Sequence, residues 1–185
     1  GGPMPVQQPA PDNQINEDHA LRHILEGTAA QTGHQFFRAL VASVTNALHC
    51  EGAWVTEYNP HEKRLRALAF RLGGKWIEDY EYHVAGTPCE SVVEQKCLVH
   101  IADRVLELYP LDNDLVDVKA VSYMGAPLLD HDGKVIGLLA ALDTRPMPPE
   151  DRCMTLFRIF AARAAAEVQR VHAEEELAWR EHKHR

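Results

Sequence analysis

The most constraining feature of the sequence is a pair of apolar segments joined by a four-residue turn. Residues 122–129 and 135–142 each have the length and composition of a strand, and the turn sequence DHDG at 130–133 lies between them. A glycine at the end of such a turn permits the positive φ angle that tight turns require. The pattern predicts an antiparallel hairpin, and therefore a sheet with antiparallel pairing.

Helical periodicity surrounds this hairpin in the sequence. The spacing predicts a helix over 33–49, which begins with Thr32 and Gln35 as a capping box, and a long helix over about 149–180. An earlier helical pattern begins near residue 18. Further strands are predicted at 53–58, 65–72 and 98–102, a short helix at 89–95, and one or two short helices within 103–118. The irregular aromatic stretch 76–84 has room for one short strand.

This order of elements predicts an α+β fold, in which one central antiparallel sheet has the N- and C-terminal helices packed on one face. We expect three parts along the chain. Residues 1–17 form a disordered leader that opens with a cloning remnant, 18–172 form the domain, and 173–185 are the end of a helix that leads to an output domain.

Charge and composition exclude several classes of function. The chain carries 19 basic and 27 acidic residues, a net charge of −8, which disfavours direct binding to nucleic acid. No run of about 18 apolar residues is present, so no membrane span is expected. The four cysteines are scattered without CxxC spacing, and we expect a reducing, cytoplasmic location.

Four strings in the sequence resemble the GAF domain, a small-molecule sensing module of bacterial signalling proteins. They are FFRAL through AWV (36–55), GTPCE (86–90), YPLD (109–112), and SYMGAPL (122–128) continuing to DGKVIG (132–137). GTPCE and SYxGxPL together resemble one subgroup, which is found upstream of histidine kinases, diguanylate cyclases and transcription regulators. The resemblance covers about residues 20–170.

The resemblance implies a ligand cavity on the other face of the sheet, beneath a lid of loops and short helices. The side chains expected to line it are mostly apolar, as is usual for pockets that take small molecules. They are Tyr82, Cys89, Val92, Val93, Ile101, Tyr123 and Met124. The implied function is sensing of an unidentified small molecule and relay of the signal through the terminal helices; neither an enzyme, a cofactor nor a metal site is expected.

Homodimerisation through the terminal helices is the alternative, with or without a ligand. A parallel bundle of two copies would cover apolar helix faces that a monomer would otherwise expose. The side chains expected at that interface are Leu21, Ile24, Leu25, Phe157, Phe160, Ala164 and Val171.

Cysteine or histidine chemistry is the less favoured interpretation. Cys89 begins a short helix, which lowers a thiol pKa, but the adjacent Glu90 opposes thiolate formation. A redox sensor or a cysteine enzyme at Cys89 stays open, although the HIAC string of GAF-fold methionine sulfoxide reductases reads HIAD here, at 100–103. The Cys-His pair of bilin-binding relatives and the NKxFDE string of cyclic-nucleotide-binding relatives are missing. His83 and His100 flank the expected pocket, but haem or metal binding is not favoured.

Overall fold

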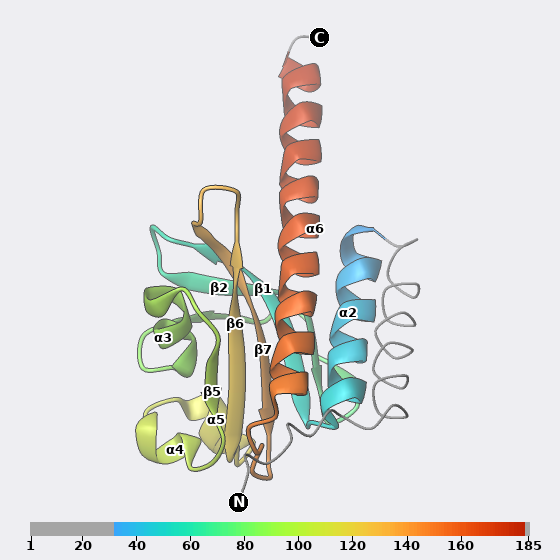
Figure 1. Ribbon diagram of the computed structural model, residues 1–185. Coiled ribbons are helices and arrows are strands. Elements are labelled where there is room, and N and C mark those ends of the chain that lie inside the picture. Colours follow the sequence, from blue (N-terminus) through green and yellow to red (C-terminus); the bar gives the residue numbers. More distant parts are fainter. Residues whose placement is uncertain (1–31, 184–185) are drawn as a thin grey trace, which may run out of the picture.

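The protein is described here by a computed structural model covering residues 32–183, whose centre is a seven-stranded antiparallel sheet (Figure 1). The spatial order is β3-β2-β1-β7-β6-β5, and β3 and β4 pair with opposite ends of β2. The strands in chain order are β1 (Gly52–Asn59), β2 (Arg64–Leu72), β3 (Lys75–Trp76), β4 (Glu81–His83), β5 (Val99–Ile101), β6 (Ser122–Leu129) and β7 (Val135–Asp143).

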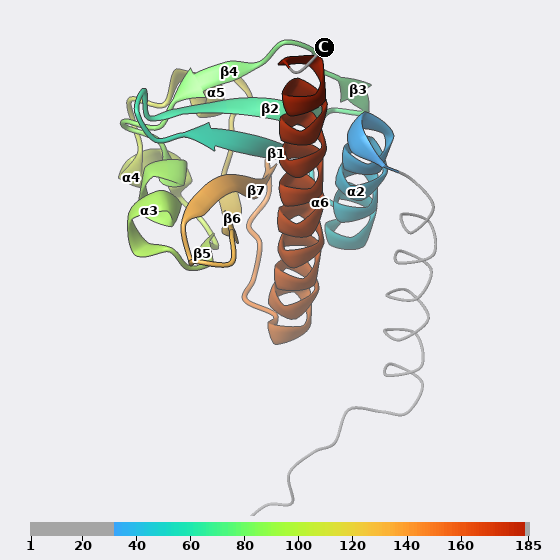
Figure 2. The same ribbon diagram turned by 90° about the horizontal axis from the view of Figure 1, so that it is seen from above.

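The helices lie in two groups on the two faces of the sheet. Helices α2 (Gly33–Leu48) and α6 (Asp151–Lys183) pack side by side on one face, as Figures 1 and 2 both show. The shorter helices α3 (Pro88–Gln95), α4 (Val105–Leu108) and α5 (Asn113–Asp117) lie on the other face. The predicted α+β class, with terminal helices on one face and short helices on the other, is confirmed. We call the segment 84–118, which carries α3, α4 and α5, the lid.

The hairpin that dominates the sequence forms as predicted. Strands β6 and β7 pair along their whole length, and Gly133 in the turn has a φ of +79°. The Asp130 carboxylate accepts hydrogen bonds from the backbone N–H groups of Asp132 and Lys134, both at 2.9 Å. These bonds hold the turn closed and also lower the pKa of Asp130.

Small residues permit close pairing in the middle of the sheet. A Cβ atom on Gly137 would collide with the backbone carbonyl of Thr56 on the neighbouring strand β1. Pro127 lies on β6 beyond the part of that strand that pairs with β5, which ends at Gly125. The missing N–H of proline therefore faces no partner strand, which agrees with the prediction of a local edge at this point.

The start of α2 differs from the predicted capping box. Thr32 has an extended N-cap conformation, but its side chain makes no capping hydrogen bond. The N–H of Gly33 donates instead to the Glu167 carboxylate of α6, at 2.8 Å. Glu167 is itself paired with Arg170 within α6, so the beginning of α2 is attached to α6 by a hydrogen bond to a charged carboxylate rather than capped locally.

The predicted dimer face is largely occupied by the protein's own core. Phe157, Phe160 and Ala164 are at most 4% exposed and pack against α2 and the sheet, so a second copy cannot use them. Their apolar spacing indicated burial correctly but not the partner. Val171 is half-buried. The remaining predicted interface residues, Leu21, Ile24 and Leu25, lie outside the described residues, as do the predicted leader and the helix near residue 18.

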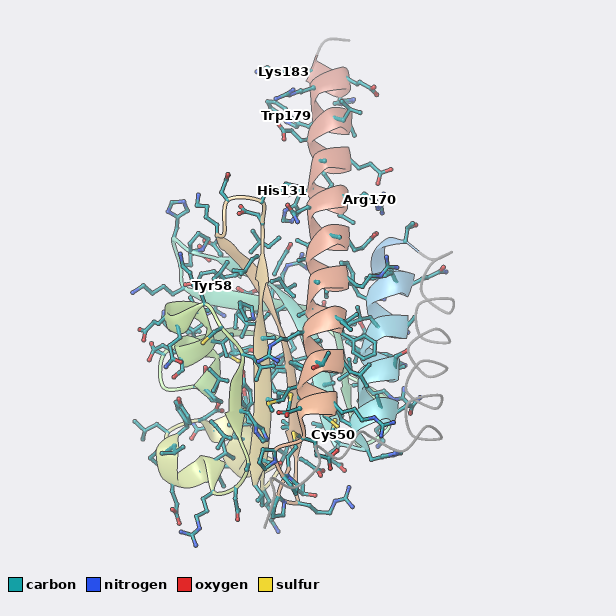
Figure 3. The ribbon with its side chains drawn as sticks, in the orientation of Figure 1. Cys50, Tyr58, His131, Arg170, Trp179 and Lys183 are labelled. Atoms are coloured by element: carbon teal, nitrogen blue, oxygen red, sulfur yellow. The ribbon has the colours of Figure 1, made fainter. Side chains whose placement is uncertain are left out.

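The last turns of α6 extend beyond the sheet (Figures 1 and 3). From His172 onward the described side chains are exposed, including Leu177 and Trp179. The Lys183 ammonium lies 4.8 Å from the centre of the Trp179 ring. Within residues 32–183, no helix combines the length and the apolar character needed to cross a membrane.

Candidate ligand pocket

A cavity of about 260 Å³ lies between the sheet and the lid. Four central strands, the β3–β4 connection, α3 and α5 all contribute to its walls. The residues that line it are Trp54, Phe70, Leu72, Ile77, Tyr80, Tyr82, Pro88, Cys89, Asp112, Asp114, Leu115, Asp117, Val118, Tyr123 and Leu142. The predicted chamber between the lid and β6 is therefore present.

Aromatic rings form a continuous wall of this cavity. The Trp54 ring centre lies 5.3 Å from that of Phe70, which lies 5.0 Å from that of Tyr80. Tyr80 and Tyr82 follow at 5.1 Å, and Tyr123 lies 6.3 Å from Trp54 on the other side. Such tilted and edge-on contacts are the favoured arrangements of aromatic pairs, so the rings fix one another in place.

Tyr123 occupies its position because the residue two places along the strand has no side chain. Residues 123 and 125 project to the same face of β6. A Cβ atom on Gly125 would lie 2.8 and 2.9 Å from two ring carbons of Tyr123 and closer still to its hydroxyl. Gly125 thus creates the space for the phenol, which is completely buried.

A chain of hydrogen bonds joins three walls of the cavity. The Trp54 indole N–H donates to the Tyr82 hydroxyl at 2.8 Å. The Cys89 sulfur lies 3.2 Å from the Tyr82 hydroxyl and 3.1 Å from that of Tyr123. Cys89 at the start of α3 therefore connects the lid to both β4 and β6, and each buried polar atom in the chain has a partner.

The environment of Cys89 does not favour a reactive thiol. Its side chain is only 1% exposed, and burial raises its pKa to about 11 in spite of the hydrogen bonds from the two tyrosines. Burial thus outweighs these hydrogen bonds, and the neutral thiol predominates at neutral pH. No disulfide joins the four cysteines, all of which lie within the described residues.

The side of the cavity formed by α5 is acidic. Asp112 caps α5 by accepting a hydrogen bond from the Leu115 N–H at 3.1 Å, and Asp114 accepts one from the Tyr80 hydroxyl. Burial, assisted by the charge of Asp114, raises the pKa of Asp112. Burial and Asp114 also raise the pKa of Tyr80. Burial and mutual repulsion thus both act against negative charge on this side of the cavity.

Three of the seven predicted pocket residues line the cavity: Tyr82, Cys89 and Tyr123. Val92 and Ile101 are buried between sheet and lid but do not reach it, and Val93 borders a different surface hollow. Met124 lies on the opposite face of the sheet, packed with the helices. The prediction placed adjacent strand residues in one pocket, whereas successive side chains of a strand point to opposite faces.

Sequence patterns did not indicate most of the aromatic wall or any of the acidic side. Trp54 and Phe70 belong to predicted strands, and their inward direction depends on the strand register. Tyr80 and the Asp112–Asp114 pair lie in stretches without regular periodicity. Two signals were available: Trp54 lies between two apolar residues of a predicted strand, where an indole N–H needs a partner, and the YPLDND string at 109–114 begins a capped helix.

The two histidines considered as metal or haem ligands have other partners. The Ala85 N–H donates to Nδ1 of His83, and Nε2–H of His100 donates to the Met147 carbonyl at 2.7 Å. Neither lines the cavity. Over residues 32–183, no group of three or more metal-ligating side chains is close enough to hold an ion.

Comparison with known proteins gives one family. The model of the GAF domain matches residues 32–168, which is most of the chain. No curated protein matches the sequence.

Solved structures share the fold at low sequence identity. The GAF domain of a phosphoenolpyruvate-protein phosphotransferase from Acinetobacter has a TM-score of 0.74 and 14% identity, with 87% of this chain and 98% of that chain covered. The corresponding domain from Coxiella burnetii has a TM-score of 0.74 and 17% identity, with coverages of 89% and 99%. The chromophore-binding domain of a Stigmatella aurantiaca bacteriophytochrome has a TM-score of 0.68 and 15% identity, with coverages of 90% and 64%.

Proposed function

Because this chain belongs to the GAF domain family, we propose that it is a sensory module that binds a small molecule in the aromatic cavity. In this proposal the occupied cavity changes the packing of α6, and α6 passes the change to an output domain such as a histidine kinase, a diguanylate cyclase or a transcription regulator. The observation that carries the proposal is the cavity itself, which lies against the same sheet that anchors α6.

Strand β6 supplies the physical connection between the two faces. Tyr123 contributes to the cavity wall, while Met124, Ala126 and Leu128 pack against the helices on the other side. The side of β6 that faces the helices is close-packed, so a shift of the strand caused by a ligand at Tyr123 is passed on to that packing. A ligand shifts the position of α6 only to the extent that it binds the two arrangements with different affinity.

A thermal-shift screen of a metabolite library tests ligand binding. A compound present at 100 times its Kd stabilises the protein by about 2.7 kcal/mol, which corresponds to a rise in Tm of about 5–10 °C. Val118→Trp fills the cavity from its edge and is expected to abolish that rise. Val116→Trp, two residues earlier and 43% exposed, is the matched control and keeps it.

The screen and one further measurement decide the proposal. Hydrogen exchange with and without the compound is expected to change both in 105–118 and in the anchored part of α6, 151–170. Absence of any stabilising compound overturns the sensory proposal. A compound that also stabilises Val118→Trp binds elsewhere and likewise contradicts it.

Homodimerisation through α6 is a second proposal. Because the predicted interface on α6 is largely buried, the proposed interface is now the exposed C-terminal end of this helix. Leu177 is 59% exposed on the part of α6 that lies beyond the sheet, and pairing with a second copy of this helix would bury it. Sedimentation is expected to give a dimer that Leu177→Glu converts to a monomer. A wild-type chain that stays monomeric at every concentration contradicts the proposal.

A further inference from the structure

We infer that the cavity between sheet and lid takes a small organic cation, namely an ammonium group carried on a compact apolar body. The inference rests on the proposed sensory function and specifies its ligand class. It comes from the combination of a preformed cavity, an aromatic wall and an acidic side, all described above.

The charged side chains that line the cavity are all acidic. Asp112, Asp114 and Asp117 line it, and none of the lining residues in the described chain is a lysine, arginine or histidine. An anionic ligand would meet repulsion from three carboxylates without any compensating partner. An ammonium group would form charge-assisted hydrogen bonds with the same carboxylates, and these are the stronger kind of hydrogen bond.

The exposure of the lining aspartates to solvent indicates how a cation would approach the cavity. Among the lining residues, Asp114 and Asp117 are exposed to solvent and Asp112 is partly buried. Two of the three carboxylates of the cavity lining are therefore in contact with solvent. A cation approaching from solvent meets carboxylates first, and the net charge of −8 over the whole chain favours its approach.

The aromatic wall suits the same ligand class. Trp54, Phe70, Tyr80, Tyr82 and Tyr123 present five rings to a single cavity. The face of an aromatic ring attracts a cation, most strongly where water is excluded. The rings also provide an apolar surface for the body of the ligand. The cavity volume of about 260 Å³ is just below the range of about 300–1,000 Å³ typical of ligand pockets. The apolar body of the ligand must therefore be compact.

The polar groups of the inner wall are not available to bind the charged end of a ligand. The buried hydroxyls of Tyr82 and Tyr123 and the Cys89 sulfur already bond to one another. No hydrogen-bond donor of the inner wall is left without a partner among the described residues. The aspartates are thus the groups with spare bonding capacity, and they accept hydrogen bonds only.

Three probes of similar size and different charge test the inference: 2-phenylethylammonium, 2-phenylethanol and 3-phenylpropanoate. Each is titrated into the full chain while the indole N–H resonances are followed by ¹⁵N NMR. The Trp54 resonance reports the cavity because its N–H bonds to Tyr82, whereas Trp76 and Trp179 lie outside it. The ammonium probe is expected to shift the Trp54 resonance and to bind at least about tenfold more tightly than the alcohol.

Aspartate variants and a control variant test whether the preference for the ammonium probe depends on the acidic side of the cavity. The double variant Asp112→Asn, Asp114→Asn is expected to lose the preference for the ammonium probe while its affinity for the alcohol is unchanged. Asparagine keeps the cap of α5 and the bond from Tyr80. Asp132→Asn, which removes one charge from the distant hairpin turn, keeps the preference. If the double variant fails to fold, exposed Asp117→Asn serves, with an expected loss of about threefold.

The outcomes separate this inference from the proposed function. If the alcohol or the carboxylate binds at the Trp54 site as tightly as the ammonium probe, the inference is overturned and ligand binding in the cavity stands. If no probe moves the Trp54 resonance, the inference is also overturned, and the metabolite screen above decides the sensory proposal separately. An ammonium preference that survives the aspartate variants contradicts the role given to the acidic side.

Discussion

Tyr123 and Met124 are consecutive residues of β6 whose side chains lie on opposite faces of the sheet, one in the cavity wall and the other against the helices. Both are at most 1% exposed. The two faces can therefore be perturbed separately at neighbouring positions, and substitutions at these positions have different expected effects.

Met124→Ala is expected to destabilise the protein by about 2–4 kcal/mol, because it leaves a void between the sheet and the helices. Urea unfolding measures this loss. The volume-conserving Met124→Leu is the control and should cost less than about 1.5 kcal/mol. Since residue 124 does not line the cavity, the affinity of any probe bound there should change less than about threefold. A large loss of affinity in a folded Met124→Ala protein contradicts the separation of the two faces.

The two central glycines of the sheet are expected to differ in their tolerance of a methyl group. Gly137→Ala places the new atom against the Thr56 carbonyl, which is part of the backbone, and should cost about 3 kcal/mol or more. Gly125→Ala meets the Tyr123 side chain, which can move into the cavity at a cost of about 1–3 kcal/mol. Unfolding free energies of the two variants should follow that order; the reverse order would be inconsistent with the register of β1, β6 and β7.

The attachment of α2 to α6 should depend on pH. Burial acts to raise the pKa of Glu167, but the Arg170 ion pair and the Gly33 N–H outweigh it, so the pKa is lowered. A carboxyl group with a lowered pKa in the folded state contributes stability above its unfolded pKa and loses it as pH falls through the folded value. Glu167→Gln should therefore cost about 1 kcal/mol at pH 7.

Urea unfolding over a pH series checks this prediction. The difference between wild type and Glu167→Gln should shrink as pH falls below the unfolded pKa, about 4.3 for glutamate. Glu174→Gln, whose exposed carboxylate also pairs with Arg170, is the control and should have a small effect at every pH. A difference that is constant from pH 7 to pH 3 would contradict a stabilising role of the ionised Glu167 carboxylate.

Alkylation should distinguish the cysteines. With a pKa of about 11, the Cys89 thiol is ionised to about one part in a thousand at pH 8, and it is buried as well. Cys97 is exposed. Mass spectrometry after iodoacetamide treatment should find Cys97 modified first and Cys89 modified only under unfolding conditions. Rapid modification of Cys89 in the folded protein would revive the redox interpretation of this residue.

The sequence was most informative where a pattern had one structural solution. The β6–β7 hairpin was predicted within one residue because its two apolar runs are joined by a turn with glycine at the position of positive φ. The helix α2 was predicted almost to its bounds, but its cap was not, because the bond from Gly33 goes to Glu167, 134 residues away. Local pattern contains no information about such a partner.

The cavity was only partly predictable for the same reason. Tyr82, Cys89 and Tyr123 were expected in its wall, but Trp54 and Phe70 come from strands whose inward faces depend on register. Tyr80 and Asp114, which bond to each other, are 34 residues apart in irregular stretches. Apolar spacing also indicated that Phe157 and Phe160 are buried without distinguishing burial within one chain from burial between two.

The 33 residues of α6 make a rod about 50 Å long, of which the last 15 follow Val168, the final residue that is buried in the core. That overhang of about 22 Å is close in length to the anchored part, so the helix has the proportions of a lever with its fulcrum at the rim of the sheet. A tilt or twist at the anchored end would be reproduced at the free end with little attenuation, because an uninterrupted helix bends only gently. Glycine or proline inserted near residue 172 would make the helix flexible or kinked at that point. A motion of the anchored part, before residue 172, would then no longer reach the free end.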